Sequence, residues 1–150
     1  MKNRMGFTLS EVLVVIGIFA IIATLAVISF SGLNDREALE KDASGLVSFI
    51  RDARMLAVSS KNAALFGVHL EAGRAVLFEG DSYIPGGAGQ KFLELSPKTY
   101  ISAFSLNEGG SDIVFSRLTG VTSDFGTVKI SLKDDTASTT ITVLPTGVVQ

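Results

Sequence analysis

The stretch that decides the fold is MGFTLSEVLVVIGIFAIIATLAVISF, residues 5–30. From Phe7 to Asn34 the chain carries one charged residue, Glu11. As an α-helix, residues 7–30 would be about 36 Å long, which is enough to cross the roughly 30 Å hydrocarbon core of a membrane. An ionised carboxylate at the centre of a bilayer costs on the order of 2.5–3.5 kcal/mol on insertion scales. Glu11 at the front of this segment therefore needs a partner.

Basic residues flank the apolar stretch unequally. Lys2 and Arg4 precede it, and the next basic residue is Arg36. Because cytoplasmic flanks carry the excess of Lys and Arg, we expect a cytoplasmic N-terminus and a single-pass transmembrane helix over residues 7–34. Residues 35–150 would then form an extracytoplasmic (periplasmic) head.

The composition excludes several kinds of chemistry. The chain has a net charge of −2 and no cysteine, so disulfides, thiol catalysis and cysteine metal sites are excluded. No carboxylate pair, metal-ligand cluster or nucleophile arrangement stands out in the sequence. We therefore expect a protein that is not an enzyme, with no catalytic residue, no metal site and no cofactor.

A helical pattern continues beyond the apolar stretch. Six apolar residues recur at spacings of three and four and form one stripe: Leu39, Ala43, Leu46, Ile50, Ala53 and Ala57. No proline occurs before Pro85, so one long helix over about residues 7–60 is allowed. Its amphipathic half, residues 35–60, would bury the stripe against a sheet.

Two local features modify this helix. Opposite charges four residues apart, Arg36 with Glu40 and Glu37 with Lys41, are expected to pair on its solvent side. The serines and glycine of residues 29–32 allow a bend that would separate a second helix. The sequence leaves open whether the helix bends there.

From residue 62 onward apolar and polar residues alternate, which is typical of strands. Residues 80–90 contain four glycines and Pro85 and are expected to form an irregular loop. We therefore expect an α+β fold in which the long helix packs on an antiparallel β-rich region over residues 63–150. The predicted strands are 64–70, 74–79, 92–95, 99–104, 112–116, 127–133 and 139–144.

Three weaker motifs have simple structural interpretations. Asp134 and Asp135 lack the ligand spacing of a calcium loop, so a hairpin turn is expected. The glycine-rich residues 86–89 lack the Lys-Ser/Thr pair and the helix of a phosphate loop. The single histidine, His69, lies in a predicted strand, where a packing or surface role is commoner than a ligand role.

The residues around Glu11 fit a processed N-terminus. If the chain is cut between Gly6 and Phe7, Phe7 carries a positive amine and Glu11 lies in the first helical turn. The helix dipole alone would then favour the carboxylate. Alternatively, many such helices pack side by side, and the desolvated Glu11 pairs with the amine of a neighbouring Phe7. That pairing would fix the axial offset between subunits.

The N-terminal residues resemble those of a known family. Residues 6–11, GFTLSE, followed by a long apolar helix, resemble the class III signal of type IV prepilins and type II secretion pseudopilins. The resemblance implies that a prepilin peptidase removes residues 1–6 as a leader, cutting between Gly6 and Phe7, and methylates the amine of Phe7. It also implies that Glu11 aids filament docking by pairing with the amine of an adjacent subunit.

The same resemblance implies a fold, a location and partners. The fold would be pilin-like, with the first half of the helix transmembrane and the second half packed on a β-rich head. The partners would be the prepilin peptidase, other pilin or pseudopilin subunits, an inner-membrane assembly platform and, before assembly, membrane lipid. The chain would end in a pilus or pseudopilus, as a structural subunit without catalysis of its own.

Other residues of the chain indicate which members of this family it resembles most. Many major pilins carry a C-terminal cysteine pair and a proline in the membrane helix; this chain has neither, and Ile28 stands near the proline position. Alternating residues 113–115, 128–132 and 141–143, with a turn at Gly147, resemble GspH/FimT-like minor pilins and pseudopilins. This favours a minor subunit of a type IV pilus or type II secretion pseudopilus, and leaves open which machine it belongs to.

Two other interpretations of the N-terminus stay open. An ordinary secretory signal would use Lys2 and Arg4 as its basic region and Ser29-Phe30-Ser31 as a cleavage site before Gly32. A plain uncleaved anchor would need no cleavage at all. Neither interpretation explains a glutamate at the start of the apolar run.

A DNA-binding minor pilin of an uptake pilus is the alternative function, because some FimT-type minor pilins bind DNA during uptake. Such binding requires a dense basic patch. Arg117, Lys129 and Lys133 are instead scattered among acidic residues of the same half of the chain: Asp112, Asp124, Asp134 and Asp135. Nucleic acid is therefore not expected as a partner.

Overall fold

The computed structural model describes residues 8–150, without the side chains of residues 25–33. The chain divides into two compact units, Met1–Asp35 and Arg36–Gln150. The predicted leader, residues 1–6, and the predicted processing residues Gly6 and Phe7 lie outside the described residues.

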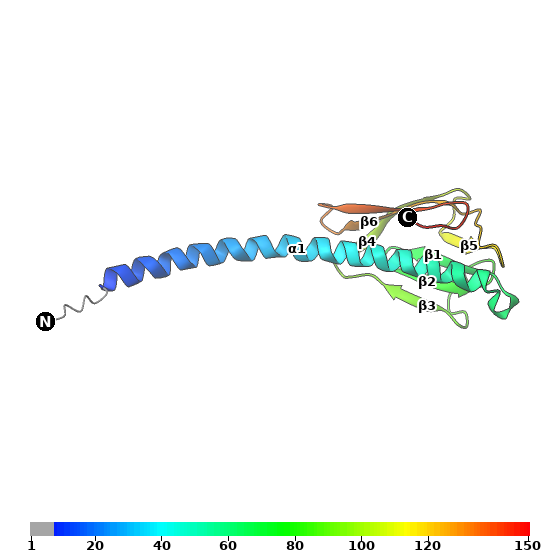
Figure 1. Ribbon diagram of the computed structural model, residues 1–150, viewed down its shortest axis with the longest axis horizontal. Coiled ribbons are helices and arrows are strands. Elements are labelled where there is room, and N and C mark those ends of the chain that lie inside the picture. Colours follow the sequence, from blue (N-terminus) through cyan, green and yellow to red (C-terminus); the bar gives the residue numbers. More distant parts are fainter. Residues whose placement is uncertain (1–7) are drawn as a thin grey trace. The chain divides into compact units, whose positions relative to one another are not determined.

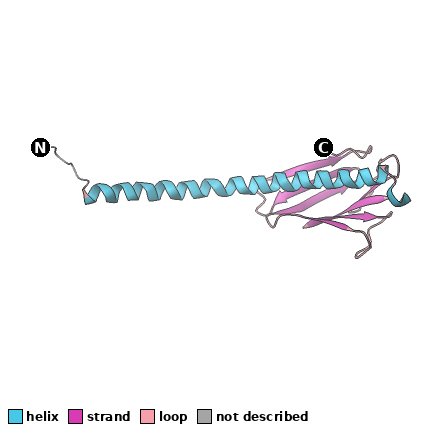
Figure 2. Cartoon of the chain, turned by 60° about the horizontal axis from the view of Figure 1, so that its bottom comes forward, coloured by secondary structure: helices cyan, strands magenta, loops and turns pink. Residues whose placement is uncertain are grey.

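Helix α1 is continuous from Leu9 to Val58 (Figure 2). It passes through residues 29–32 without interruption, so no second helix begins there. Shortly after its end, Ser60 takes a φ of 53°, in the left-handed region, and the chain turns into the short 3-10 helix η1, Lys61–Ala63. The predicted long helix is therefore confirmed for the described residues.

The predicted apolar stripe of α1 is buried in the second unit. Its six side chains are at most 7% exposed, and the last four, from Leu46 to Ala57, are at 0%. The predicted ion pairs on the solvent side were wrong: in the part of the chain that the structure describes, Arg36–Glu40 and Glu37–Lys41 do not pair. Exposed pairs gain little in water and cost side-chain entropy, which explains why the spacing alone does not enforce them.

The described chain forms two antiparallel sheets in the second unit (Figure 1). The first has the strand order β3-β2-β1-β5, and the second has the order β4-β6-β7. The strands are β1 Phe66–Glu71, β2 Arg74–Glu79, β3 Lys91–Glu94, β4 Thr99–Leu106, β5 Asp112–Phe115, β6 Gly126–Leu132 and β7 Ser138–Val143. All seven predicted strands are present, and their ends differ from the predicted ones by at most two residues.

The pairings within the sheets explain the turns. The β1–β2 hairpin aligns Phe66 with Glu79 and Glu71 with Arg74, so Ala72-Gly73 forms its turn. Strand β5 returns across the sequence to pair with β1, aligning Phe115 with Phe66. Beyond β7, the amide of Gln150 donates to the carbonyl of Thr142 at 3.0 Å, so the C-terminal segment lines the outer edge of the second sheet.

One hydrophobic cluster joins α1 to both sheets. It contains the six stripe residues together with buried side chains of β1, β2 and β5 from the first sheet and of β4, β6 and β7 from the second. Side chains that are 0% exposed include Val68 on β1, Ile113 on β5 and Val128 on β6. The helix therefore serves as the common support on which both sheets pack.

Three polar side chains of α1 tie distant segments to the helix. The buried carboxylate of Asp42 accepts the amide of Ser96 at 2.9 Å and the hydroxyl of Thr99. Arg51 donates to the carbonyl of Val149 at 2.9 Å. Arg54 donates through Nε to the carbonyl of Gly120 at 3.1 Å. These bonds hold the β3–β4 loop, the C-terminal segment and the β5–β6 connection against α1.

Candidate functional site

The first turn of α1 holds Glu11 in a reciprocal cap. The hydroxyl of Thr8, directly before the helix, accepts the amide of Glu11 at 3.3 Å. The carboxylate Oε2 of Glu11 in turn accepts the amide of Thr8 at 3.2 Å and its hydroxyl at 3.2 Å. This arrangement is a capping box, and it satisfies two backbone amides that have no partner inside the helix.

The capping box shows that Thr8 also takes part in the structure at the start of α1. The sequence predicted Phe7 as the partner of Glu11, whereas the structure adds Thr8. The signal was present, because a threonine followed three residues later by glutamate and then by an apolar run is the sequence pattern of a capping box. Phe7 lies outside the described residues, so its pairing with Glu11 stays a prediction.

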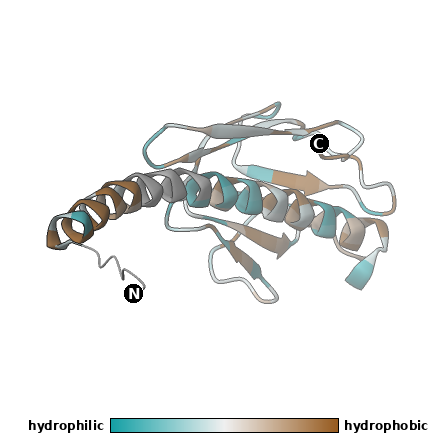
Figure 3. Ribbon diagram, turned by 60° about the vertical axis from the view of Figure 1, so that its left-hand side comes forward, coloured by the Kyte–Doolittle hydropathy of each residue, from teal (hydrophilic) through white to brown (hydrophobic). Residues whose placement is uncertain are grey.

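Beyond the cap, α1 exposes large apolar side chains on every side. Successive residues from Val12 to Ile16 are between 45% and 65% exposed, and Phe19 is 69% exposed. This end of the helix is coloured as hydrophobic in Figure 3. A contiguous apolar surface of this kind marks a site of interaction with protein or membrane. Where side chains are described, this apolar surface of α1 is exposed in the single chain.

Within the part of the chain that the structure describes, no helix combines the length and the hydropathy needed to cross a bilayer. The transmembrane helix predicted over residues 7–34 includes Phe7 and the side chains of residues 25–33, which lie outside the described residues.

His69 lies in a small polar cluster on the first sheet. Its ring stacks on Tyr83, with centroids 4.0 Å apart and planes 14° from parallel. Its Nδ1 lies 2.5 Å from Oδ1 of Asp112, whose other oxygen accepts the amide of Tyr83 at 3.1 Å. The cluster pins the loop that follows β2 to the face of the sheet, which is a packing role for the histidine.

Two carboxyl groups near this cluster have shifted pKa values. The hydrogen bond from Arg74, at 2.7 Å, lowers the pKa of Glu71 below its usual range. Burial raises the pKa of Asp124, although its carboxylate accepts the amide of Val114 at 2.9 Å; the nearby Glu108 and Asp112 act in the same direction as burial. Both carboxylates therefore have hydrogen-bond partners within the head.

The described residues contain no group of three or more His, Cys, Asp or Glu side chains that could hold a metal ion. A groove of about 660 Å³ between α1 and the β3–β4 loop is lined by Lys41, Asp42 and Leu93. Oδ2 of Asp42 accepts both the amide of Ser96 and the hydroxyl of Thr99, so this carboxylate fixes the β3–β4 loop to α1. Asp134 forms a turn by accepting the amide of Thr136 at 3.1 Å.

Comparison with known proteins adds two findings. Residues 1–27 match the prokaryotic N-terminal methylation motif. The fold is similar to that of the minor pseudopilin EpsH from the Type 2 Secretion System of Vibrio cholerae, with a TM-score of 0.57 and 15% sequence identity over 75% of this chain and 94% of that chain. No curated protein matches the sequence.

The two findings support different predictions. The structural similarity confirms the predicted α+β, pilin-like fold of a helix packed on antiparallel sheets. The motif covers the capped, apolar start of α1. The motif match therefore supports the resemblance of residues 6–11 to a prepilin signal, and the structural match shows that the fold is similar to that of a minor pseudopilin.

Proposed function

We propose that the chain is a minor subunit of a type II secretion pseudopilus, built into the filament through the start of α1. The observation that carries the proposal is the exposed apolar surface of α1 behind the Thr8–Glu11 cap. The similarity to a minor pseudopilin supports the choice of a secretion machine over a type IV pilus. The absence of cysteines supports a minor subunit.

Processing would precede assembly. A prepilin peptidase would cut between Gly6 and Phe7 and methylate the new amine of Phe7; the methylation motif over residues 1–27 supports this step. Before cleavage the first half of the helix, residues 7–34, would lie among lipids in the inner membrane, with residues 35–150 on the periplasmic side. An inner-membrane platform would then transfer the subunit to the pseudopilus.

Glu11 would supply the docking contact in this scheme. In the single chain its carboxylate bonds to Thr8, where it is exposed to solvent. Between packed helices the carboxylate would be desolvated, and the amine of a neighbouring Phe7 is the cation that would compensate its charge. The apolar side chains from Val12 to Ile28 would then pack against other subunits.

The alternative of a DNA-binding uptake pilin gains no support. The structural similarity is to a secretion pseudopilin. Among the basic residues considered for it, Arg117 donates to the carbonyl of Ala63 at 3.1 Å, and Lys129 lies on β6 directly opposite Thr140. These positions do not add up to the dense basic patch that phosphate binding requires.

The experiment that tests the proposal is the mass of the N-terminal peptide of membrane-extracted protein from the native host. A start at methylated Phe7 is expected. A start at Gly32 would indicate an ordinary secretory signal, and a start at Met1 a plain anchor; both would contradict the proposal. Gly6→Leu provides the control, because a bulky residue at the cleavage site should leave the precursor intact.

A further inference from the structure

The solvent side of α1 in the second unit carries a second stripe, which we call the outer stripe. Its members recur at spacings of three and four and so share one face of the helix. The outer stripe consists of Glu37, Glu40, Ser44, Ser48, Arg51, Met55 and Val58. All seven residues are exposed, and the face that they share is turned away from the buried stripe.

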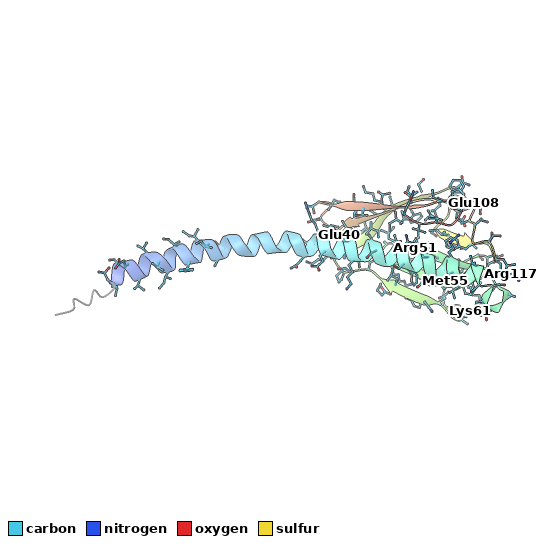
Figure 4. All side chains as sticks on the ribbon, in the orientation of Figure 1. Glu40, Arg51, Met55, Lys61, Glu108 and Arg117 are labelled. Carbon is cyan, nitrogen blue, oxygen red and sulfur yellow. The ribbon has the colours of Figure 1, made fainter. Side chains whose placement is uncertain are left out.

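The two ends of the outer stripe differ in chemistry. Glu37 and Glu40 form an acidic end, and neither carboxylate bonds to another described residue. At the other end Arg51 uses Nη2 on the carbonyl of Val149, which leaves other N–H groups of the guanidinium for a partner. Figure 4 shows Glu40, Arg51 and Met55 following one another along α1.

The basic end is also the most apolar part of this face. Met55 is 64% exposed and Val58 is 39% exposed. Both line a groove of about 370 Å³ that continues to Val148, itself 45% exposed. A joined set of exposed apolar side chains beside a partly available guanidinium is typical of a contact surface and not of a solvated helix face.

The stripe is complementary to itself when two parallel copies are staggered. Eleven residues make about three helical turns, or ~16 Å, and return to nearly the same face. At that stagger Glu40 of one copy meets Arg51 of the other, so the charges are opposite. Ser44 meets Met55, so the small side chain leaves room for the large one.

We propose that the outer stripe is a contact surface between two neighbouring copies of this chain, staggered by about three turns of α1. The proposal rests on the proposed function, because subunits anchored by the same end are necessarily parallel. It requires two adjacent copies and not a filament built of this chain alone. The acidic end of one copy lies on the basic, apolar end of the next, and the serines allow the helices to approach closely.

Cysteine crosslinking tests the contact directly, because the natural chain has no cysteine. Full-length chains carrying Ser44→Cys and Met55→Cys, with different tags, are co-expressed in the native host and oxidised mildly. A disulfide between the two differently tagged chains is expected. Ser105→Cys, on the exposed part of β4, replaces Ser44→Cys as the matched control and should give no product with Met55→Cys.

Charge exchange tests the chemistry of the same contact. In the crosslinking pair, Arg51→Glu or Glu40→Arg in both chains should lower the yield several-fold. The two changes together should restore it, because the pair is then reversed. A yield that is indifferent to both single changes would overturn the proposal.

The outcomes separate this inference from the proposed function. Filament incorporation of the unmodified chain is measured in parallel. Incorporation without the 44–55 disulfide leaves the subunit function intact and overturns the staggered contact. A disulfide between two Ser44→Cys chains would indicate pairing without the stagger and overturn it as well. A chain that is neither processed nor incorporated would contradict the proposed function. It would also overturn the staggered contact, which depends on that function.

Discussion

The backbone of Gly147 lies against the carbonyl oxygen of Gly120, with no space for a side chain between them. A Cβ atom at Gly147 would stand 2.0 Å from that oxygen, and the residue has a φ of 75°. Arg54 donates to the same carbonyl, so the helix, the β5–β6 connection and the C-terminal turn meet at one point. The contact makes glycine necessary here for both steric and conformational reasons.

Gly147→Ala should therefore destabilise the head by more than the cost of placing alanine at a positive φ. A positive φ costs a non-glycine residue about 1–2 kcal/mol. The collision adds to that cost because backbone atoms must move. Gly86→Ala is the matched control, since Gly86 has a φ of 77° but open space around its Cβ position. Equal free energies of unfolding for the two variants in denaturant titrations would contradict the steric argument.

Thr8→Ala should loosen the start of α1. The substitution removes the hydroxyl that accepts the Glu11 amide, and loss of such a cap costs about 0.5–2 kcal/mol of helix stability. We expect faster hydrogen exchange at the amide of Glu11 in micelles. Ser10→Ala is the control, because the Ser10 hydroxyl contacts only the hydroxyl of Thr8 among the bonds at this end. Unchanged exchange in Thr8→Ala would argue against the capping box.

Substitutions of Glu11 can separate capping from docking. Glutamine can fill the same place in a capping box but carries no charge. Glu11→Gln should keep the helix start and be processed, yet enter the filament as poorly as Glu11→Val, because neither offers a negative charge to the amine of a neighbouring Phe7. Immunoblots of sheared filaments measure incorporation. Normal incorporation of Glu11→Gln would show that the cap suffices and that the charge is not the docking group.

Asp42→Ala should destabilise the connection between the two sheets. The change leaves the amide of Ser96 without its acceptor, and the hydroxyl of Thr99 keeps only the carbonyl of Ser96 at 3.2 Å. An unsatisfied buried donor costs about 1–3 kcal/mol. Asp52→Ala, on the exposed side of α1, is the control and should change the free energy of unfolding by less than about 0.5 kcal/mol. Thermal unfolding of both variants compares the two positions.

Asp124 should give the head a pH-dependent stability. Burial raises its pKa above the ordinary 3.8, so the folded state holds the proton more tightly than the unfolded chain does. The stabilisation that comes from this tighter proton binding is fully present below pH 3.8. It is lost as the pH rises through the higher pKa that Asp124 has in the folded state. Relative to Asp124→Asn, the natural chain should lose stability across that window.

The measurement for Asp124 is the free energy of unfolding from pH 3 upward for the two chains. Asparagine keeps an oxygen that can accept the Val114 amide, so the comparison isolates the charge. Asp81→Asn, on the exposed loop after β2, is the control and should run parallel to the natural chain. Parallel curves for Asp124→Asn as well would mean that the burial of Asp124 has no effect on its proton affinity.

The sequence predicted those features that depend on local periodicity. The stripe from Leu39 to Ala57 was identified from spacing alone, because a helix repeats its faces every three to four residues. The strands predicted over residues 64–70 and 74–79 correspond to β1 and β2, because alternating apolar and polar residues mark both. Strand ends were less accurate, since they depend on partner strands: Ala64 and Leu65 continue the pattern but have no place in β1.

Features that depend on distant contacts were not predictable. The division into two sheets arises because β5 pairs with β1 across more than forty residues, and no local signal specifies that partner. His69 was expected to be a packing residue, but its neighbours Tyr83 and Asp112 come from a loop and another strand. At the candidate site the roles of Gly6, Phe7 and Glu11 in processing and docking stay predictions, while the cap by Thr8 was missed although its spacing was visible.

The three polar ties of α1 have a mechanical consequence. Asp42, Arg51 and Arg54 bond to segments 54, 98 and 66 residues away, on both sides of the head. A pull along the helix therefore reaches both sheets at the same time, in shear across a shared interface, instead of peeling one sheet away first. In a filament that transmits force through its helices, such a head would carry tension as one body and would yield only when these bonds and the common core fail together.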